Sequence, residues 1–259
     1  MLANVTEESL ARALFSAERN SEPIAPLVRD RPDLDVAAAY AVQRAGRELR
    51  LAGGDELRGH KVGLTSQAMQ EMLGVRQPDF GYLLASMLVP AGGSIALEGL
   101  IAPRVEAEIA FYLGERLSGP GVTPEQVMAA TSQVAPALEV IDSRIADWEI
   151  TLVDTVADNA SSARAVIGEP IAAHGLDLAE LEGRLTVGGE KVVGRGDAVL
   201  GHPSRAVAWL ANTLADFGEA LEPGEVIIPG AIARALPVQA GSVARADFGQ
   251  LGSVEVRFE

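Results

Sequence analysis

The sequence predicts an α+β protein built around a mixed β roll or sandwich. After about residue 56, strand-like segments are short, and helices interrupt them irregularly instead of alternating with them one by one. Helical periodicity is concentrated near the N-terminus. We therefore expect one domain over residues 1–259, in which a helical N-terminal segment, residues 1–55, packs on a β-rich core, residues 56–259.

The composition narrows the classes of function. The chain has 259 residues, 48% of them hydrophobic, and 36 Asp and Glu against 21 Lys and Arg, which gives a formal net charge of −15. This balance argues against nucleic acid and anionic membranes as partners. Cysteine is absent, which excludes disulfides, zinc–thiolate sites and thiol nucleophiles. The sequence shows neither a signal peptide nor an apolar run of membrane-spanning length, so we expect a cytoplasmic location.

The N-terminal segment predicts two helices. Thr6, followed by two glutamates, is a plausible helix start, and Asp35 is a plausible N-cap for a second helix. Gly53 and Gly54 are expected to end that second helix. None of these residues suggests chemistry, so packing against the core or a neighbouring subunit is the expected role.

The next stretch carries a lysine between glycines. Lys61 lies in Gly59–Gly63, and Ser66 is expected to cap a short helix through Met69 and Met72. An ordinary exposed lysine is the alternative interpretation. Residues 77–82 have the Pro, Asp and Gly content of a loop, which is where we expect Asp79.

Residues 103–111 alternate like a half-buried strand. Apolar side chains occupy one face, and Glu106 and Glu108 occupy the other. A solvated polar face is the alternative interpretation, because like charges two residues apart are only mildly unfavourable in water.

A second apolar stretch, residues 136–141, contains a single carboxylate. Glu139 within such a buried strand is costly unless a cation meets it. Together Glu106, Glu108 and Glu139 make a hard, all-oxygen site that suits Mg²⁺ or Mn²⁺. We therefore predict one divalent metal site shared by the two strands.

The remaining elements complete the predicted core. Thr123 starts a helix with a capping box, and Ser204 is expected to cap another that Gly218 ends. Residues 142–159 are polar and are expected to form a loop. Gly188 and Gly189 join a hairpin, and residues 254–258 alternate as a closing strand.

Common catalytic signatures are missing from the sequence. No glycine-rich loop opens a helix after a strand, which leaves nucleotide binding without support. The three histidines lack metal-binding spacing, and Ser161 and Ser162 lack the context of a serine nucleophile.

Several separate motifs, spread over nearly the whole chain, resemble those of one family. The hydratase/decarboxylase branch of the fumarylacetoacetate hydrolase superfamily is similar in Gly59-His60-Lys61-Val62-Gly63-Leu64-Thr65-Ser66, Gln77-Pro78-Asp79-Phe80-Gly81, Pro103-Arg104-Val105-Glu106-Ala107-Glu108, Leu138-Glu139-Val140-Ile141-Asp142-Ser143-Arg144 and Val156-Ala157-Asp158-Asn159-Ala160-Ser161. The resemblance implies the β-roll core of the family's C-terminal domain, a single catalytic domain and a homo-oligomer. It also implies association with the decarboxylase or aldolase of the same pathway.

The resemblance also implies the reaction. The expected enzyme is a metal-dependent hydratase of aromatic or steroid meta-cleavage catabolism that converts 2-hydroxypenta-2,4-dienoate, or the hexadienoate, into a 4-hydroxy-2-oxo acid. The alternatives are hydration of 2-oxohept-4-ene-1,7-dioate and decarboxylation of 4-oxalocrotonate. A non-catalytic cation-binding protein is a remote alternative, because it would need neither Lys61 nor Asp79.

The resemblance assigns the site residues. Glu106, Glu108 and Glu139 match its metal ligands, and Lys61 matches its lysine, for which we expect proton transfer or neutralisation of the substrate carboxylate. Asp79 is expected to orient water or relay a proton, at a position where the decarboxylases carry an apolar residue. Substrate binding is expected from Ser161, Ser162, Gly81 and Leu83.

Overall fold

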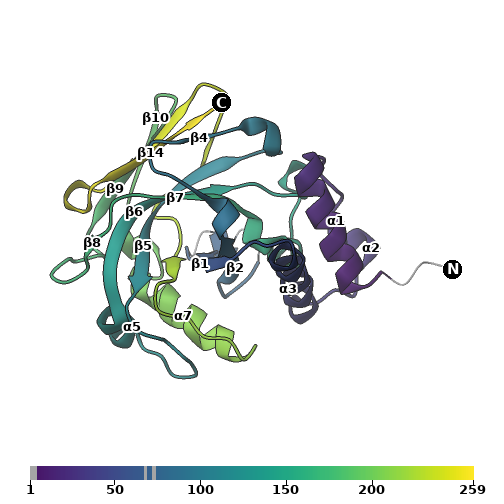
Figure 1. Ribbon diagram of the computed structural model, residues 1–259, viewed down its shortest axis with the longest axis horizontal. Helices are drawn as coiled ribbons and strands as arrows, with labels where there is room; N and C mark the ends of the chain where they lie inside the picture. Colours follow the sequence, from purple (N-terminus) through teal and green to yellow (C-terminus); the bar gives the residue numbers. More distant parts are fainter. Residues whose placement is uncertain (1–4, 67–68, 72–73) are drawn as a thin grey trace.

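Two β-sheets form the centre of the computed structural model, and helices flank them (Figure 1). The structure describes residues 5–66, 69–71 and 74–259. The larger sheet has the strand order β2-β1-β11-β5-β6-β7-β3, with β12 beside β5 and β8 beside β6, and the smaller has the order β10-β9-β13-β14-β4. Both sheets mix parallel and antiparallel pairs, which confirms the predicted α+β class with a mixed, curled β core.

The bounds of the strands are as follows. The larger sheet contains β1 (Leu57–Gly63), β2 (Asp79–Leu84), β3 (Leu88–Val89), β5 (Arg104–Leu113), β6 (Thr131–Ile141), β7 (Ser162–Ile167), β8 (Ile171–Ala172), β11 (Val226–Ile228) and β12 (Leu236–Pro237). The smaller contains β4 (Ser94–Ile95), β9 (Glu182–Val187), β10 (Glu190–Arg195), β13 (Val243–Asp247) and β14 (Ser253–Phe258). The predicted hairpin and closing strand are confirmed as β9–β10 and β14.

The described helices are α1 (Glu7–Asn20), α2 (Leu27–Asp30), α3 (Val36–Ala52), α5 (Pro124–Ala130), α6 (Leu152–Ala157) and α7 (Pro203–Ala215). The predicted N-caps of α1, α3 and α5 are confirmed, because Thr6, Asp35 and Thr123 each accept a hydrogen bond from a first-turn amide. Within the described residues, no helix has the length and apolar character needed to cross a membrane.

Helix α3 lies against the outer edge of the larger sheet. Gln43 Nε2 donates to the carbonyl oxygens of Phe80 and Val156, both over 2.8 Å. Tyr40 stacks on Phe80 with ring centroids 4.5 Å apart. The free edge of β2 is therefore covered by the helical segment, which protects its backbone from water.

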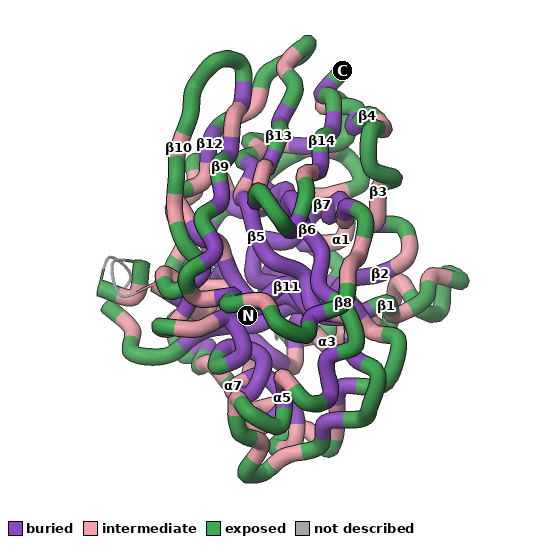
Figure 2. Tube along the Cα trace, turned by 90° about the vertical axis from the view of Figure 1, so that its left-hand side faces the viewer, coloured by how far each residue is buried: buried purple, intermediate pink, exposed green. Residues whose placement is uncertain are grey.

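Strands β5 and β6 run through the buried centre of the molecule (Figure 2). Their antiparallel register places Glu106 opposite Glu139 and Glu108 opposite Ala137. The other face of β5 carries Val105, Ala107, Ile109 and Phe111, all buried in the main hydrophobic core. The predicted period-two pattern of this strand is confirmed.

Three local predictions are wrong. Residues 79–84 form the buried strand β2, not a loop, because pairing with β1 and cover from α3 satisfy a backbone that looks turn-like in sequence. The polar stretch 142–159 contains α6, which Thr151 starts with a capping box. Helix α7 begins earlier than expected, because Pro203 occupies its first turn and the His202 side chain, not Ser204, is the N-cap.

The short helix expected from Ser66 through Met72 crosses positions 67–68 and 72–73, which lie outside the described residues. At its start, the Met69 amide donates to Ser66 Oγ over 3.3 Å, as expected for the proposed cap.

Candidate metal and catalytic site

Three glutamates meet on the inner face of the larger sheet. Glu106, Glu108 and Glu139 each offer one carboxylate oxygen, and these oxygens lie within 4.8 Å of one another. Glu108 and Glu139 are fully buried, at 1% and 0% exposure. The alternative of a solvated polar face is therefore wrong, because a solvated face would leave these carboxylates in water.

The glutamate cluster fits a hard divalent cation. Within the described part of the chain, Glu108 Oε1 and both carboxylate oxygens of Glu139 accept no hydrogen bond, although Lys61 Nζ lies 3.3 Å from Glu139 Oε2. Buried anionic oxygens without partners are costly, and a cation that binds them removes that cost. Oxygen ligands alone favour Mg²⁺, Mn²⁺ or Ca²⁺ over thiophilic metals. Glu108 Oε2 is oriented by the Gly230 amide, which donates to it over 2.7 Å.

Lys61 and Asp79 face this cluster from strands β1 and β2, which β11 separates from β5. In the β1–β2 register Lys61 lies opposite Gly81, and Gly63 lies opposite Asp79, so the two charged residues lie diagonally on one face. A Cβ on Gly63 would lie 2.3 Å from Asp79 Oδ1 and 3.3 Å from Lys61 Nζ. The glycines therefore leave the space in which both side chains meet.

Lys61 is buried and ion-paired. Its Nζ lies 3.3 Å from Glu139 Oε2 and donates to the Ala160 carbonyl oxygen over 3.0 Å. The alternative of an ordinary exposed lysine is therefore wrong, since the residue is only 3% exposed. Burial by itself lowers the pKa of Lys61, but the carboxylates of Glu139 and Asp79 outweigh it, so the pKa lies above its usual value.

Burial and mutual repulsion raise the pKa values of the carboxyl groups. Desolvation and then the charge of Glu139 raise the pKa of Glu106 to about 7. The same two causes raise the pKa of Glu108 well above its ordinary value. Desolvation also raises the pKa of Asp79, against the opposing effect of Lys61. One ammonium group therefore does not neutralise the site, and a divalent cation would supply the missing positive charge.

The four predicted substrate-binding residues are all buried. Leu83 shares the face of β2 that carries Asp79 and Gly81, and it is fully buried. A Cβ on Gly81 would lie 2.6 Å from the Asn159 carbonyl oxygen, so this glycine lets the turn that contains Asn159 pack closely against β2. Ser161 Oγ lies 3.3 Å from Thr155 Oγ1, and Ser162 Oγ has no hydrogen-bond partner among the residues described.

The prediction from sequence missed residues that support the site. Asn159 bonds to both backbone polar groups of Tyr82, and Arg144 contacts the chain on both sides of that asparagine. A Cβ on Gly230 would collide with Thr65 at 2.1 Å from its Oγ1, so that glycine admits the backbone close to Glu108. Of these residues, only Asn159 could have been recognised in the sequence as a candidate for an unusual turn, because asparagine tolerates left-handed backbone.

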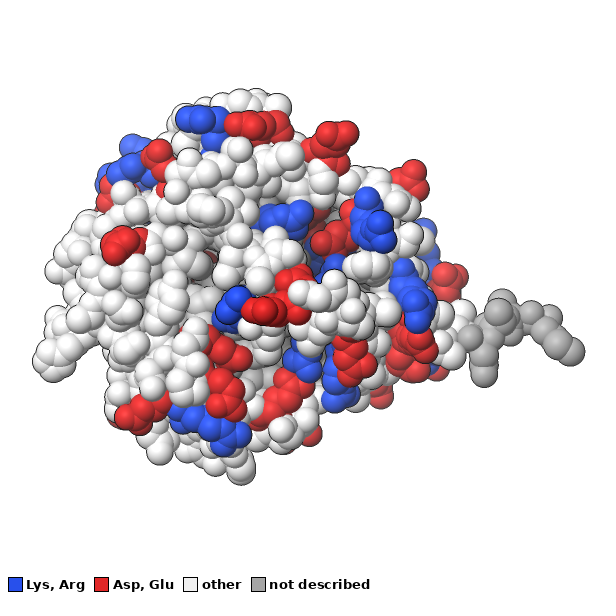
Figure 3. Space-filling model, viewed as in Figure 1, with Lys and Arg blue, Asp and Glu red and all other residues white. Residues whose placement is uncertain are grey.

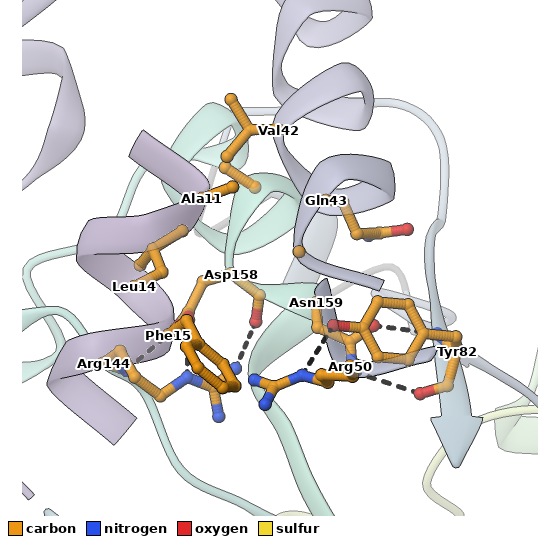
Figure 4. Close-up of a pocket in the computed structure, with 12 residues that line it drawn as sticks. Ala11, Leu14, Phe15, Val42, Gln43, Arg50, Tyr82, Arg144, Asp158 and Asn159 are labelled. Atoms are coloured by element: carbon orange, nitrogen blue, oxygen red, sulfur yellow. Dashed lines mark hydrogen bonds and ion pairs between the residues drawn. The ribbon is translucent and has the colours of Figure 1, made fainter. Parts of the chain in front are cut away.

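A separate open cavity lies between α1, α3 and the turn after α6 (Figure 4). Tyr82 lines it, and since successive side chains of a strand point to opposite faces, this cavity lies behind β2 relative to Asp79 and Gly81. On the face shown in Figure 3, basic side chains are interspersed with acidic ones and form no continuous band among the described residues.

A curled mixed sheet whose buried carboxylates fit a divalent cation, with a lysine and an aspartate beside them, is typical of metal-dependent enzymes. The sequence profile described as fumarylacetoacetate (FAA) hydrolase C-terminal matches residues 53–259. The chain belongs to this family.

Curated relatives match almost the whole chain. It is 46% identical over 238 residues to a 2-hydroxyhexa-2,4-dienoate hydratase of Comamonas testosteroni, covering 90% of each protein. It is 44% identical over 254 residues to a 2-keto-4-pentenoate hydratase of Paraburkholderia xenovorans strain LB400, covering 97% of this chain and 94% of that one.

A solved structure is also similar over nearly the full length. The 4-oxalocrotonate decarboxylase from Pseudomonas putida G7, complexed with magnesium and adipate, superposes with a TM-score of 0.95 at 39% identity. The match covers 98% of this chain and 97% of that one.

Proposed function

We propose that the protein is a divalent-metal-dependent hydratase that converts 2-hydroxypenta-2,4-dienoate, or the hexadienoate, into the corresponding 4-hydroxy-2-oxo acid. The observation that carries this proposal is the buried group of Glu106, Glu108 and Glu139 with Lys61 and Asp79 beside it. The hydratases of Comamonas testosteroni and Paraburkholderia xenovorans, at 46% and 44% identity, support it.

Glu106, Glu108 and Glu139 would hold Mg²⁺ or Mn²⁺. When bound, the cation would accept the carboxylate and keto oxygens of a 2-oxo acid and polarise its carbonyl group. The three side chains come from two paired strands, so their separation is fixed by the sheet before any ligand arrives.

The reaction needs two proton movements and one addition of water. Ketonisation removes the proton of the 2-hydroxyl group and adds a proton at C5, which leaves a C3–C4 double bond conjugated to the carbonyl. Water oxygen then bonds to C4, one water proton leaves it, and C3 gains a proton. General acid–base groups within hydrogen-bond reach carry out such transfers.

Lys61 and Asp79 divide these tasks according to their charge. Because its carboxylate neighbours keep Lys61 protonated, the ammonium group serves as a proton donor or as the partner of the substrate carboxylate. The raised pKa of Asp79 suits a carboxyl group that accepts a proton from water and returns it.

The test is an ultraviolet assay with 2-hydroxypenta-2,4-dienoate. In the presence of Mg²⁺ the conjugated absorbance should disappear, and the product should be 4-hydroxy-2-oxopentanoate by mass spectrometry. Excess chelator should abolish the change, and added Mg²⁺ or Mn²⁺ should restore it. Metal binding without any turnover would indicate a non-catalytic cation-binding protein instead.

Decarboxylation of 4-oxalocrotonate is the second candidate, because the decarboxylase of Pseudomonas putida G7 has nearly the same fold at 39% identity. Asp79 argues against it, since a carboxylate there repels the second carboxylate of a diacid. Both substrates should be compared at saturating Mg²⁺, in the wild type and in Asp79→Ile. Faster release of carbon dioxide than hydration by the wild type would contradict the hydratase assignment.

A further inference from the structure

We propose that Arg144 is a positioning residue that holds the Lys61 ammonium group in place through a strained backbone turn. The kinetic part of this inference rests on the proposed hydration, whereas the structural part does not.

The turn consists of residues 159–161. Asn159, Ala160 and Ser161 have φ angles of 55°, 49° and 55°, so three consecutive non-glycine residues adopt left-handed backbone. Left-handed backbone is unfavourable for a residue with a side chain and persists only where its surroundings enforce it. The Ala160 carbonyl oxygen in the middle of this turn accepts the hydrogen bond from Lys61 Nζ. The strained conformation thus supplies the acceptor that Lys61 uses.

Arg144 joins the two ends of that turn. Its Nη2 donates to the Asp158 carbonyl oxygen just before the turn, and its Nη1 donates to the Ser162 carbonyl oxygen just after it, over 3.1 Å. Nη1 also donates to the Asp142 carbonyl oxygen over 2.6 Å. One planar guanidinium group therefore fixes the span that the turn must cross.

The position of Arg144 is itself fixed by a buried ion pair. Arg144 Nε donates to Asp158 Oδ1 over 2.5 Å, and the Arg144 amide donates to Asp158 Oδ2 over 2.9 Å. Both residues are about 3% exposed. Figure 4 shows the pair at the wall of the cavity, with Asn159 between it and Tyr82 in this view.

The turn is also attached to the strand that carries Asp79. The Tyr82 amide donates to Asn159 Oδ1 over 2.8 Å, and Asn159 Nδ2 donates to the Tyr82 carbonyl oxygen over 3.1 Å. These bonds align the turn with β2 but do not close its ends. The Ser161 amide donates to the Asp158 carbonyl oxygen over 3.0 Å within the turn, and Arg144 adds the link from Asp158 to Ser162. A lysine ammonium at the same place lacks the planar fork that reaches both carbonyl groups.

A double-mutant cycle tests whether Arg144 acts through Lys61. The four chains are the wild type, Arg144→Lys, Lys61→Met and the double variant, each assayed at saturating Mg²⁺ over a range of substrate concentrations. Arg144→Lys should lower kcat by about tenfold or more, in line with the cost of small displacements of reacting groups, and leave KM nearly unchanged. In the Lys61→Met background, Arg144→Lys should cause no further loss of kcat. An equal loss in both backgrounds, or an unchanged kcat, would overturn the proposal.

A labelling experiment gives a readout that is independent of hydration. The sequence contains two lysines, Lys61 and Lys191, and Lys191 is exposed. Reductive methylation followed by peptide mapping should modify Lys191 and spare Lys61 in the wild type. In Arg144→Lys, the rate at Lys61 should rise at least about tenfold relative to Lys191, because its carbonyl partner is no longer held. An unchanged relative rate would contradict the proposal even if the enzyme catalysed another reaction.

Arg50→Lys is the matched control. Arg50 lines the same cavity and pairs with Glu18 and Tyr82 Oη, so its replacement also disturbs a partly buried ion pair. It should leave the Lys61 labelling rate unchanged. If Arg144→Lys does not fold, Asp158→Asn takes its place, because it weakens the ion pair while preserving shape. Full activity with wild-type labelling in that variant would equally refute the role of Arg144.

Discussion

At the scale of single residues, the site is a group of buried charges that do not balance. Glu106, Glu108, Glu139 and Asp79 lie around one ammonium group, that of Lys61. Without a cation, protonation of the carboxylates offsets part of the cost of their burial and mutual repulsion, which is why the pKa values of Glu106 and Glu108 are raised. Single substitutions here should therefore affect metal binding and turnover more than folding.

Glu108→Gln should weaken binding of Mg²⁺ and Mn²⁺ strongly. The amide removes one negative charge from the site, and the loss should exceed the 10–100-fold that substitutions next to metal ligands typically cause. Calorimetric titration with Mn²⁺ measures it directly. Glu255→Gln is the control, because Glu255 is an exposed glutamate on β14, and it should bind metal like the wild type.

Lys61→Met should lower turnover by a factor on the order of 10² or more, the usual contribution of a general acid–base group. The metal-free variant should also melt at a lower temperature than the metal-free wild type, because Glu139 loses its buried partner. Lys191→Met, which removes the exposed lysine, should change neither quantity. Normal turnover by Lys61→Met would show that Lys61 has a purely structural role.

At the scale of elements, strands β1 and β2 act as a matched pair in which glycine makes room for charge. Gly63 lies across from Asp79, and Gly81 lies across from Lys61, so each long side chain has a residue without a side chain opposite it. Strand β6 supplies Glu139 to the same space from the other side of the site. The register of the pair, not one residue alone, sets this geometry.

Gly63→Ala should reduce kcat while β1 remains folded. The added Cβ would lie 2.3 Å from Asp79 Oδ1, closer than such atoms approach, so the carboxyl group must move. Displacement of a reacting group by about 1 Å can lower the rate on the order of 10²-fold. Gly99→Ala is the control, because a Cβ there meets no heavy atom within 4 Å. Steady-state kinetics and thermal melts of both variants test the prediction, and equal kcat values would contradict it.

At the scale of the whole molecule, the curl of the larger sheet brings distant strands together. In the strand order, β11 and β5 separate β1 from β6. Three steps between strands span about 14 Å in a flat sheet. Lys61 Nζ nevertheless lies 3.3 Å from Glu139 Oε2. The stability of this curved assembly therefore determines whether the site exists.

Acid should destabilise the protein through His60. This side chain points to the opposite face of β1 from Lys61, and burial, then the charge of Arg47, lowers its pKa to about 4 against the opposing charge of Glu219. His60 Nδ1 lies 3.7 Å from Glu225, but the neutral ring forms no ion pair at neutral pH. Because the unfolded chain binds a proton near pH 6.5 and the folded chain does not, stability is lost as the pH drops from about 6.5 toward 4.

The expected loss from His60 at pH 5 is about 2 kcal/mol relative to pH 7.5. Denaturant unfolding of the wild type and of His60→Leu at the two pH values isolates this contribution from that of other groups. The free energy of unfolding should decrease less in the variant. The same pH dependence in both proteins would show that His60 does not titrate as inferred.

The sequence by itself determined the candidate residues for the chemistry and the strands that carry the three glutamates. The alternation around Glu106 and Glu108, the lone Glu139 in an apolar run and the caps at Thr6, Asp35 and Thr123 are local patterns, so they were predictable. The resemblance of five short motifs to a family indicated the fold and the activity in the same way.

Only the tertiary structure decided how these pieces meet. Residues 77–82 look like a loop in sequence, but residues 79–84 form a strand because β1 and Gln43 satisfy their backbone. Arg144 has no local partner that reveals its role, since the carbonyl groups of Asp158 and Ser162 converge on it only after β6 and β7 pair. Contacts between residues far apart in the chain depend on sheet curvature and burial, and neither property is encoded by the spacing within a single segment.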